Sequence, residues 1–129
     1  MGPAGQEIPA IYHSDSTFRD VSSIISDFSG ETLHPKRLAD LAEVDIASLP
    51  ILEGNLRYGP PITGTGKFIC VGLNYSDHAA ETNADVPQEP VLFMKATSSI
   101  IGCNDDIEMP RGSMKMDWKW SLVSLLGKK

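Results

Sequence analysis

A dense run of prolines and glycines divides this chain of 129 residues near its middle. Proline removes a backbone donor and fixes one backbone dihedral angle, and glycine adds conformational freedom, so neither supports an uninterrupted helix or interior strand. We therefore expect a small leading domain over residues 1–58, a linker over residues 59–66, and a second domain over residues 67–129. The run consists of Pro50, Gly54, Gly59, Pro60, Pro61, Gly64 and Gly66.

The charge balance excludes several classes of partner. The chain has 17 Asp and Glu against 11 Lys and Arg, for a formal net charge of -6, so it repels phosphate backbones and anionic membrane surfaces.

The N-terminal residues lack the basic and apolar regions of a secretory signal, and no apolar run approaches the ~20 residues of a membrane span. Cys70 and Cys103 are too few for a disulfide framework. We expect a cytoplasmic protein that binds neither nucleic acid nor membrane.

Patterning in the leading domain predicts a hairpin and a helix. Two β-prone stretches, residues 9–13 and 17–21, flank a polar turn. Further along, Pro35 suits the first position of a helix that continues to about Glu43, with leucines and alanines on one face. The leading domain is therefore expected to be a small α/β unit.

The second domain is expected to be rich in strands. Short apolar runs at residues 68–71 and 91–94 are typical of buried strands, and residues 117–126 form a weaker third candidate. Asn74 is a suitable N-cap for a helical turn over residues 75–82. The fold class predicted for the whole chain is α+β and rich in β structure.

Three residues in this domain are candidates for catalysis. His78 and Glu81 are three residues apart, which on a helix places them on one face, where a carboxylate orients an imidazole for water activation. The same spacing is also common in plain surface ion pairs. Lys95 closes an apolar strand, either as a solvated strand end or as a cation for a substrate carboxylate or enolate.

The motifs around these residues resemble a known enzyme family. Residues 67–81 contain V-G-x-N-Y-x-D-H-x-x-E, residues 89–95 contain P-x-L-F-x-K, and the similarity continues through residues 104–108 and 110–113 to Asp117 and Trp118. These blocks, in this order, resemble the fumarylacetoacetate hydrolase family. The resemblance is greatest to the bacterial branch that includes enzymes named ureidoglycolate lyase and 2-hydroxyhepta-2,4-diene-1,7-dioate isomerase.

The resemblance implies both a fold and an activity. Family members hydrolyse, cleave or isomerise small keto acids, such as acylpyruvate-, oxaloacetate- or ureidoglycolate-like substrates, with Mg²⁺ or Mn²⁺, and are commonly dimers. By resemblance, His78 and Glu81 form the water-activating pair on a lid helix, and Lys95 is a pocket lysine. Residues 67–129 then correspond to the opening strands and lid helix of an incomplete catalytic β-roll.

The chain departs from the family pattern at the metal ligands. After the Asp-Trp that matches residues 117–118, relatives continue Glu-Val-Glu, and these two glutamates are metal ligands; here Lys119 and Ser121 occupy their positions. A cation and a neutral hydroxyl do not replace two hard anionic ligands. We therefore expect no tight metal binding and no activity from this chain alone. The alternatives are a non-catalytic module that pairs with a full-length family subunit or, less favoured, a substitute metal site formed by Asp105, Asp106, Glu108 and Asp117.

A single-base deletion accounts for the altered residues. If the DNA after the Trp118 codon once encoded the family continuation Glu-Val-Glu-Leu-Gly-Val-Val-Ile-Gly-Lys, loss of its first base yields residues 119–128 for a suitable choice of synonymous codons. The coding DNA tests this frameshift hypothesis. Insertion of one base after the Trp118 codon is expected to restore a family-like reading frame, and an unrelated sequence in that frame contradicts the hypothesis.

Overall fold

The structure, a computed structural model, describes residues 1–73, 87–116 and 122–124. The chain divides into two compact units. The first comprises Met1–Gly64 together with the chain from Ile101 onward, and the second comprises Thr65–Ile100. Each unit is described by itself below.

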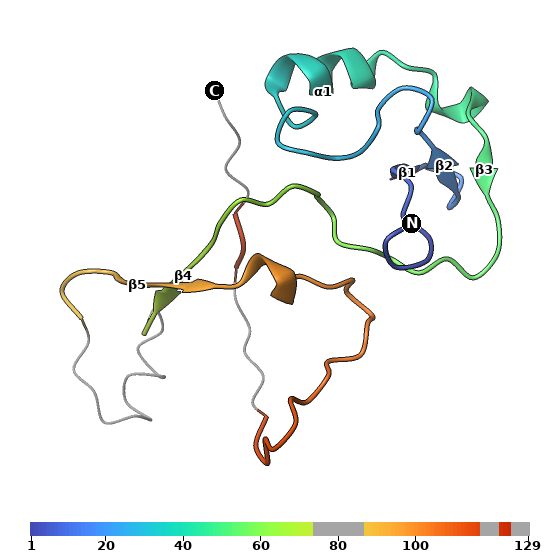
Figure 1. Cartoon of the computed structure of the whole chain (residues 1–129). Helices are drawn as coiled ribbons and strands as arrows, with labels where there is room; N and C mark the ends of the chain where they lie inside the picture. Colours follow the sequence, from blue (N-terminus) through green and yellow to red (C-terminus); the bar gives the residue numbers. More distant parts are fainter. Residues whose placement is uncertain (74–86, 117–121, 125–129) are drawn as a thin grey trace. The chain divides into compact units, whose positions relative to one another are not determined.

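The first unit contains a small antiparallel sheet in the order β1-β2-β3 (Figure 1). Strand β1 (Ala10–Tyr12) pairs with β2 (Phe18–Asp20), and β2 also pairs with β3 (Ile51–Leu52). The central strand β2 is thus held on both sides, by a local hairpin and by a segment some thirty residues downstream. This pairing confirms the hairpin predicted from the sequence.

Asp15 organises the turn of this hairpin. Its carboxylate accepts hydrogen bonds from the backbone N–H of Thr17 at 3.1 Å and from the Thr17 hydroxyl, and it also pairs with Arg19. Ser16 adopts a left-handed backbone conformation with φ of 66°, which a tight turn requires. The backbone N–H of His13 donates to the Thr17 carbonyl at 2.9 Å and closes the turn. Local polar contacts therefore set the hairpin register.

The interior of the first unit is small. Val21 is fully buried directly after β2, and Leu41 of the helix is nearly so. The rings of Tyr12 and Phe18 lie 5.1 Å apart, and Tyr58 meets Phe18 edge-on at 5.5 Å. These aromatic contacts connect β1 and β2 to the Pro- and Gly-rich segment.

Helix α1 (Pro35–Ala42) begins where the sequence predicts. Pro35 occupies its first turn, and the side chain of His34 caps the helix by accepting from the backbone N–H of Lys36 at 3.3 Å. A short 3₁₀ turn, η1 (Ile46–Ser48), then leads into β3. Of the apolar face expected for this helix, Leu41 is buried, whereas Leu38 and Ala42 are exposed.

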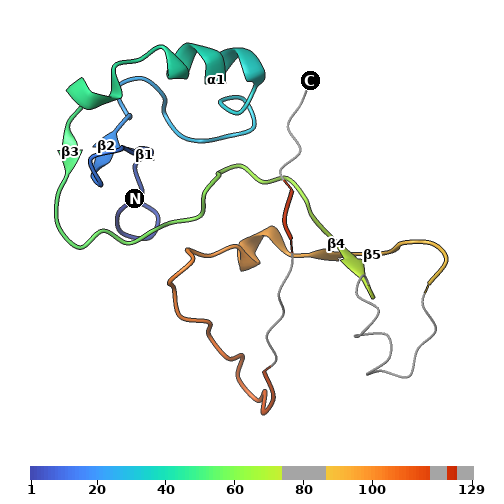
Figure 2. The same ribbon diagram turned by 180° about the vertical axis from the view of Figure 1, so that it is seen from behind.

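The second unit is built on one antiparallel pair of strands, β4 (Phe68–Gly72) and β5 (Val91–Lys95), and ends in the 3₁₀ turn η2 (Thr97–Ser99) (Figures 1 and 2). Apolar side chains occupy both faces of this pair. One face carries Ile69, Val71, Leu92 and Met94, which are 46–68% exposed. Phe68, Cys70, Val91 and Phe93 lie on the other face. A sheet with one solvated face normally carries polar side chains on that face, so this pattern is typical of strands covered on both sides.

The observed elements support a mixed α+β chain, and both strands predicted in the second domain are present. Their expected burial is not observed: every residue of β5 is exposed, and no residue of β4 is fully buried. The helical turn predicted over residues 75–82 lies outside the described residues. Of the strand predicted over residues 117–126, the structure describes only 122–124, which are exposed and not in a strand. Among the described residues, no helix has the length and apolarity required to cross a bilayer.

Contacts group the chain differently from the domain boundaries proposed for it. The expected linker is partly packed, because Thr63 donates its backbone N–H to the Phe28 carbonyl at 2.8 Å and forms a parallel bridge with Ser29. The first unit also includes the segment that begins at Ile101, which the sequence pattern places in the second domain. The division into residues 1–58, 59–66 and 67–129 stays a prediction about family domains.

Candidate functional site

Lys95 is the one proposed catalytic residue that lies in the described part of the chain. His78 and Glu81 fall within residues 74–86, and Lys119 and Ser121 within residues 117–121, so all four lie outside the described residues. Their juxtaposition with Lys95 stays a prediction from the family motif.

Lys95 is placed by the register of the β4–β5 pair. It is the last residue of β5 and lies opposite Phe68, the first residue of β4. Its ammonium nitrogen is 5.7 Å from the centre of the Phe68 ring, within the range of a cation–π contact worth about 0.5–1 kcal/mol at an exposed site. The lysine therefore has an aromatic support, with its ammonium group at one end of the sheet, where it can meet an anion.

The residue that follows strand β4 has an unusual backbone conformation. Strand β4 ends at Gly72, and Leu73 then adopts a left-handed conformation with φ of 49°. A leucine in this region costs about 1–3 kcal/mol, and such residues are found disproportionately at functional sites. This strained residue lies within the V-G-x-N-Y-x-D-H-x-x-E motif, five residues before His78.

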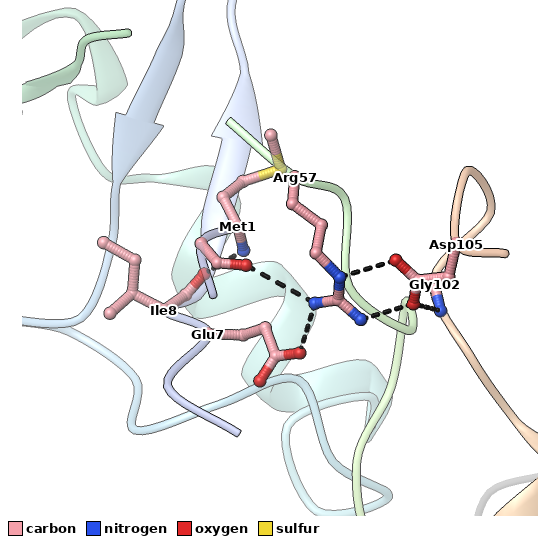
Figure 3. A network of polar contacts seen from close by, with 7 residues as sticks. Met1, Glu7, Ile8, Arg57, Gly102 and Asp105 are labelled. Atoms are coloured by element: carbon pink, nitrogen blue, oxygen red, sulfur yellow. Dashed lines mark hydrogen bonds and ion pairs between the residues drawn. The ribbon is translucent and has the colours of Figure 1, made fainter. Parts of the chain in front are cut away.

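The most extensive polar site in the described residues is centred on Arg57 (Figure 3). The guanidinium group donates from Nε to Asp105 Oδ1 at 2.6 Å and from Nη2 to Asp105 Oδ2, which makes a bidentate pair. Nη1 donates to Glu7 Oε1 at 2.6 Å and, more weakly, to the Gly2 carbonyl at 3.4 Å. We call Gly2, Glu7, Arg57, Gly102 and Asp105 the Arg57 clasp.

Close backbone packing accompanies these charges. The backbone N–H of Gly102 donates to Asp105 Oδ2 at 2.7 Å, and a Cβ at position 102 would collide with the Tyr58 carbonyl oxygen. At Gly59, a Cβ would lie 2.7 Å from Cγ of Glu7. Both glycines are therefore required by close approach, and they explain why these segments can pack around the guanidinium.

The ion pairs of the Arg57 clasp shift the pKa values of its charged groups. Hydrogen bonds from Arg57 hold the pKa values of the Glu7 and Asp105 carboxyls below their ordinary ranges. The same contacts, that with Asp105 foremost, raise the pKa of the Arg57 guanidinium. All three groups are therefore charged near neutral pH, and the cluster is suited to holding chain segments together rather than to transferring protons.

The Arg57 clasp contains Asp105, which is also one of the ligands considered for a substitute metal site. Asp105 already accepts two hydrogen bonds from Arg57 and one from Gly102, so its oxygens are not directed at a common ligand. Among residues 1–73, 87–116 and 122–124, no three His, Cys, Asp or Glu side chains gather closely enough to hold a metal ion. Within residues 104–108, Asp105 is a partly buried ion-pair partner of Arg57, whereas the other four residues are exposed.

Comparison with known proteins identifies the second half of the chain. Residues 67–129 match the family model described as fumarylacetoacetate (FAA) hydrolase C-terminal. This segment belongs to the fumarylacetoacetate hydrolase family. The match begins immediately before β4 and includes Lys95 and Asp105, whereas Glu7 and Arg57 precede it.

Bacterial relatives resemble the chain along almost its entire length. A protein of Burkholderia lata named "Putative hydrolase" is 48% identical over 126 residues, which is 98% of this chain and 45% of that relative. Relatives with the same name from Burkholderia ambifaria and Burkholderia orbicola are also 48% identical, over 98% and 99% of this chain and 45% of each relative. The chain thus spans a little under half the length of these relatives.

The lowered pKa values of Glu7 and Asp105 predict a loss of stability in acid. Carboxyls whose pKa is lower in the folded state stabilise the fold above their unfolded values, 4.5 and 3.8, and this stabilisation is lost as the pH falls through their folded values. We expect the urea midpoint of the first unit to fall between about pH 5 and pH 2.

Asp105→Asn isolates the contribution of the clasp. The pKa of Asp15 is also lowered, chiefly by its hydrogen bond from Thr17. Asp15 therefore contributes to the acid sensitivity of the wild type and of the Asp105→Asn variant alike. The variant is expected to be less stable at neutral pH and to have a shallower pH dependence. If the urea midpoint depends on pH with the same slope in the wild type and in the variant, the acid sensitivity does not arise from the clasp.

Proposed function

We propose that this chain is a fragment of a divalent-metal-dependent hydrolase, lyase or isomerase that acts on small keto acids, and that it is inactive alone. The main support is the match of residues 67–129 to the family model, together with the motif that carries His78, Glu81 and Lys95. Acylpyruvate-, oxaloacetate- and ureidoglycolate-like compounds are the proposed substrate classes for the intact enzyme. The names of the Burkholderia relatives support a hydrolase-type activity.

Each proposed catalytic residue has a role that its chemistry suits. His78 acts as the base that takes a proton from water, and Glu81 orients its imidazole and stabilises the imidazolium form. Lys95 supplies a cation for a substrate carboxylate or for an oxygen on which negative charge develops. Its position at the end of β5, supported by the Phe68 ring, suits a residue that meets an anionic ligand.

The residues present do not fit the metal that the family uses. Mg²⁺ and Mn²⁺ prefer carboxylate oxygens, and the two ligand positions hold Lys119, whose ammonium repels a cation, and Ser121, whose hydroxyl is neutral. When bound in an intact enzyme, the metal polarises a substrate oxygen and stabilises charge that develops there. The proposed inactivity rests on this disagreement, and the frameshift over residues 119–128 remains our proposal for its origin.

Restoring the two carboxylates tests the ligand assignment. We expect Lys119→Glu combined with Ser121→Glu to bind Mn²⁺ at least about tenfold more tightly than the wild type, because two hard anionic ligands replace a cation and a hydroxyl. Isothermal titration with MnCl₂ measures the affinity. Oxaloacetate or acylpyruvate turnover with Mg²⁺, followed by absorbance, is expected to be absent for the wild-type chain.

A variant with the same change of charge elsewhere provides the control. Lys115→Glu combined with Ser113→Glu changes the net charge equally at two positions outside the proposed site. Equal Mn²⁺ affinity of the two double variants would show that non-specific attraction explains the binding. Magnesium-dependent turnover by the wild type overturns the proposed inactivity.

A second candidate function is a non-catalytic module that pairs with a full-length family subunit. The observation that favours it is the apolar character of both faces of the β4–β5 pair, on which Leu92 and Met94 are 65% and 68% exposed. Exposed apolar faces next to strand edges are typical of surfaces that another polypeptide covers. A family subunit is the proposed partner because the Burkholderia relatives contain more than twice the matched length of chain.

Leu92→Lys tests this pairing. We expect the substitution to weaken the association with a purified full-length Burkholderia relative at least about tenfold, because a charge would be buried at the contact. Co-purification and analytical ultracentrifugation measure the association. Ile107→Lys is the control, since Ile107 is 70% exposed but belongs to the first unit. Equal effects of the two substitutions, or no association of the wild type, argue against the module.

A further inference from the structure

The donors of Arg57 are committed to protein acceptors. Hydrogen bonds use all three guanidinium nitrogens, and Asp105 occupies the Nε–Nη2 edge that would otherwise bind a carboxylate in a bidentate manner. The side chain of Arg57 is also 28% exposed, so it is neither open to a ligand nor deeply buried. This arrangement is suited to joining chain segments rather than to binding a substrate.

The segments that Arg57 joins are far apart in sequence. Glu7 is 50 residues from Arg57, and Asp105 is 48 residues from it on the other side. Asp105 and Gly102 lie inside the stretch that matches the family model, whereas Glu7 and Arg57 lie outside it. Figure 3 shows the guanidinium between the two carboxylates, with Gly102 beside Asp105.

Backbone contacts reinforce the charged contacts on both sides. On one side, the backbone N–H of Gly2 donates to the Arg57 carbonyl at 3.0 Å, and the N–H of Ile8 donates to the Met1 carbonyl at 2.9 Å. On the other, the N–H of Asp105 donates to the Gly102 carbonyl at 3.1 Å. One guanidinium thus holds two small hydrogen-bonded loops in place.

We propose that the Arg57 clasp couples the order of residues 2–8 to the order of residues 102–105, so that residues outside the family match hold part of the matched segment in place. The coupling arises because Glu7 and Asp105 position the same guanidinium. Loss of either carboxylate frees the guanidinium to move and weakens its bond to the other. Such a coupling is reciprocal by thermodynamic necessity: order in the first loop favours order in the second by the same factor as order in the second favours order in the first.

Amide hydrogen exchange of the full chain, resolved by NMR, tests the reciprocity. In Asp105→Asn, the Ile8 amide, remote from the substitution, is expected to exchange about threefold faster or more. In Glu7→Gln, the Asp105 amide is expected to exchange faster by a similar factor. These cross-effects separate coupling from local damage, which would alter only the loop that carries the substitution.

Gly102→Ala provides an independent test without a change of charge. An added Cβ would collide with the Tyr58 carbonyl oxygen and displace the loop of residues 102–105. The variant is expected to accelerate exchange of the Ile8 amide as Asp105→Asn does. Arg111→Gln is the matched control, because Arg111 is an exposed arginine outside the clasp, and it is expected to leave both amides unchanged.

The His13 amide reports whether the first unit remains folded, since it donates to the Thr17 carbonyl within the hairpin. Its protection is expected to persist in the Glu7→Gln and Gly102→Ala variants. Absence of cross-effects in both Glu7→Gln and Asp105→Asn, with the hairpin protected, overturns the proposal. If Asp105→Asn unfolds the hairpin as well, the other two variants test the coupling. Faster exchange of the Asp105 amide in Glu7→Gln and of the Ile8 amide in Gly102→Ala supports the proposal, and unchanged exchange of both amides overturns it.

Discussion

The guanidinium of Arg57, shared between two carboxylates, is the interaction on which the first unit most depends. Arginine suits this position because its planar fork donates to one carboxylate in a bidentate manner and still has a nitrogen for a second. A lysine has a single nitrogen and cannot offer two fixed edges. The contact gathers the N-terminal residues, the Pro- and Gly-rich segment and the loop around Gly102 about one charge.

Polar contacts matter in this unit because its apolar interior is limited. Val21 and Leu41 are the hydrophobic residues that are buried in the described part of the chain. In the absence of a large core, the fold relies on the Asp15-centred turn, the cap of α1 and the aromatic contacts of Phe18. The buried Arg19 of β2 extends the same pattern, since it donates to the Leu49 carbonyl at 3.0 Å and connects the hairpin to the chain before β3.

Local signals in the sequence were sufficient for the hairpin, helix α1 and strands β4 and β5. Each rests on information within a few residues: turn formers around Asp15, a proline at a helix start, or a short apolar run. The Arg57 clasp has no such local signal, because its partners are some 50 residues away and single charged residues are common on any surface. The candidate catalytic residues came from the family motif, and of these the described structure places only Lys95.

The left-handed conformation of Leu73 has an energetic consequence at the end of β4. Glycine would adopt this conformation without strain. For a leucine, the extended and right-handed helical conformations are lower in energy, so the left-handed one is kept only where surrounding contacts outweigh its cost. Residue 73 therefore stores strain within the family motif, five residues before His78.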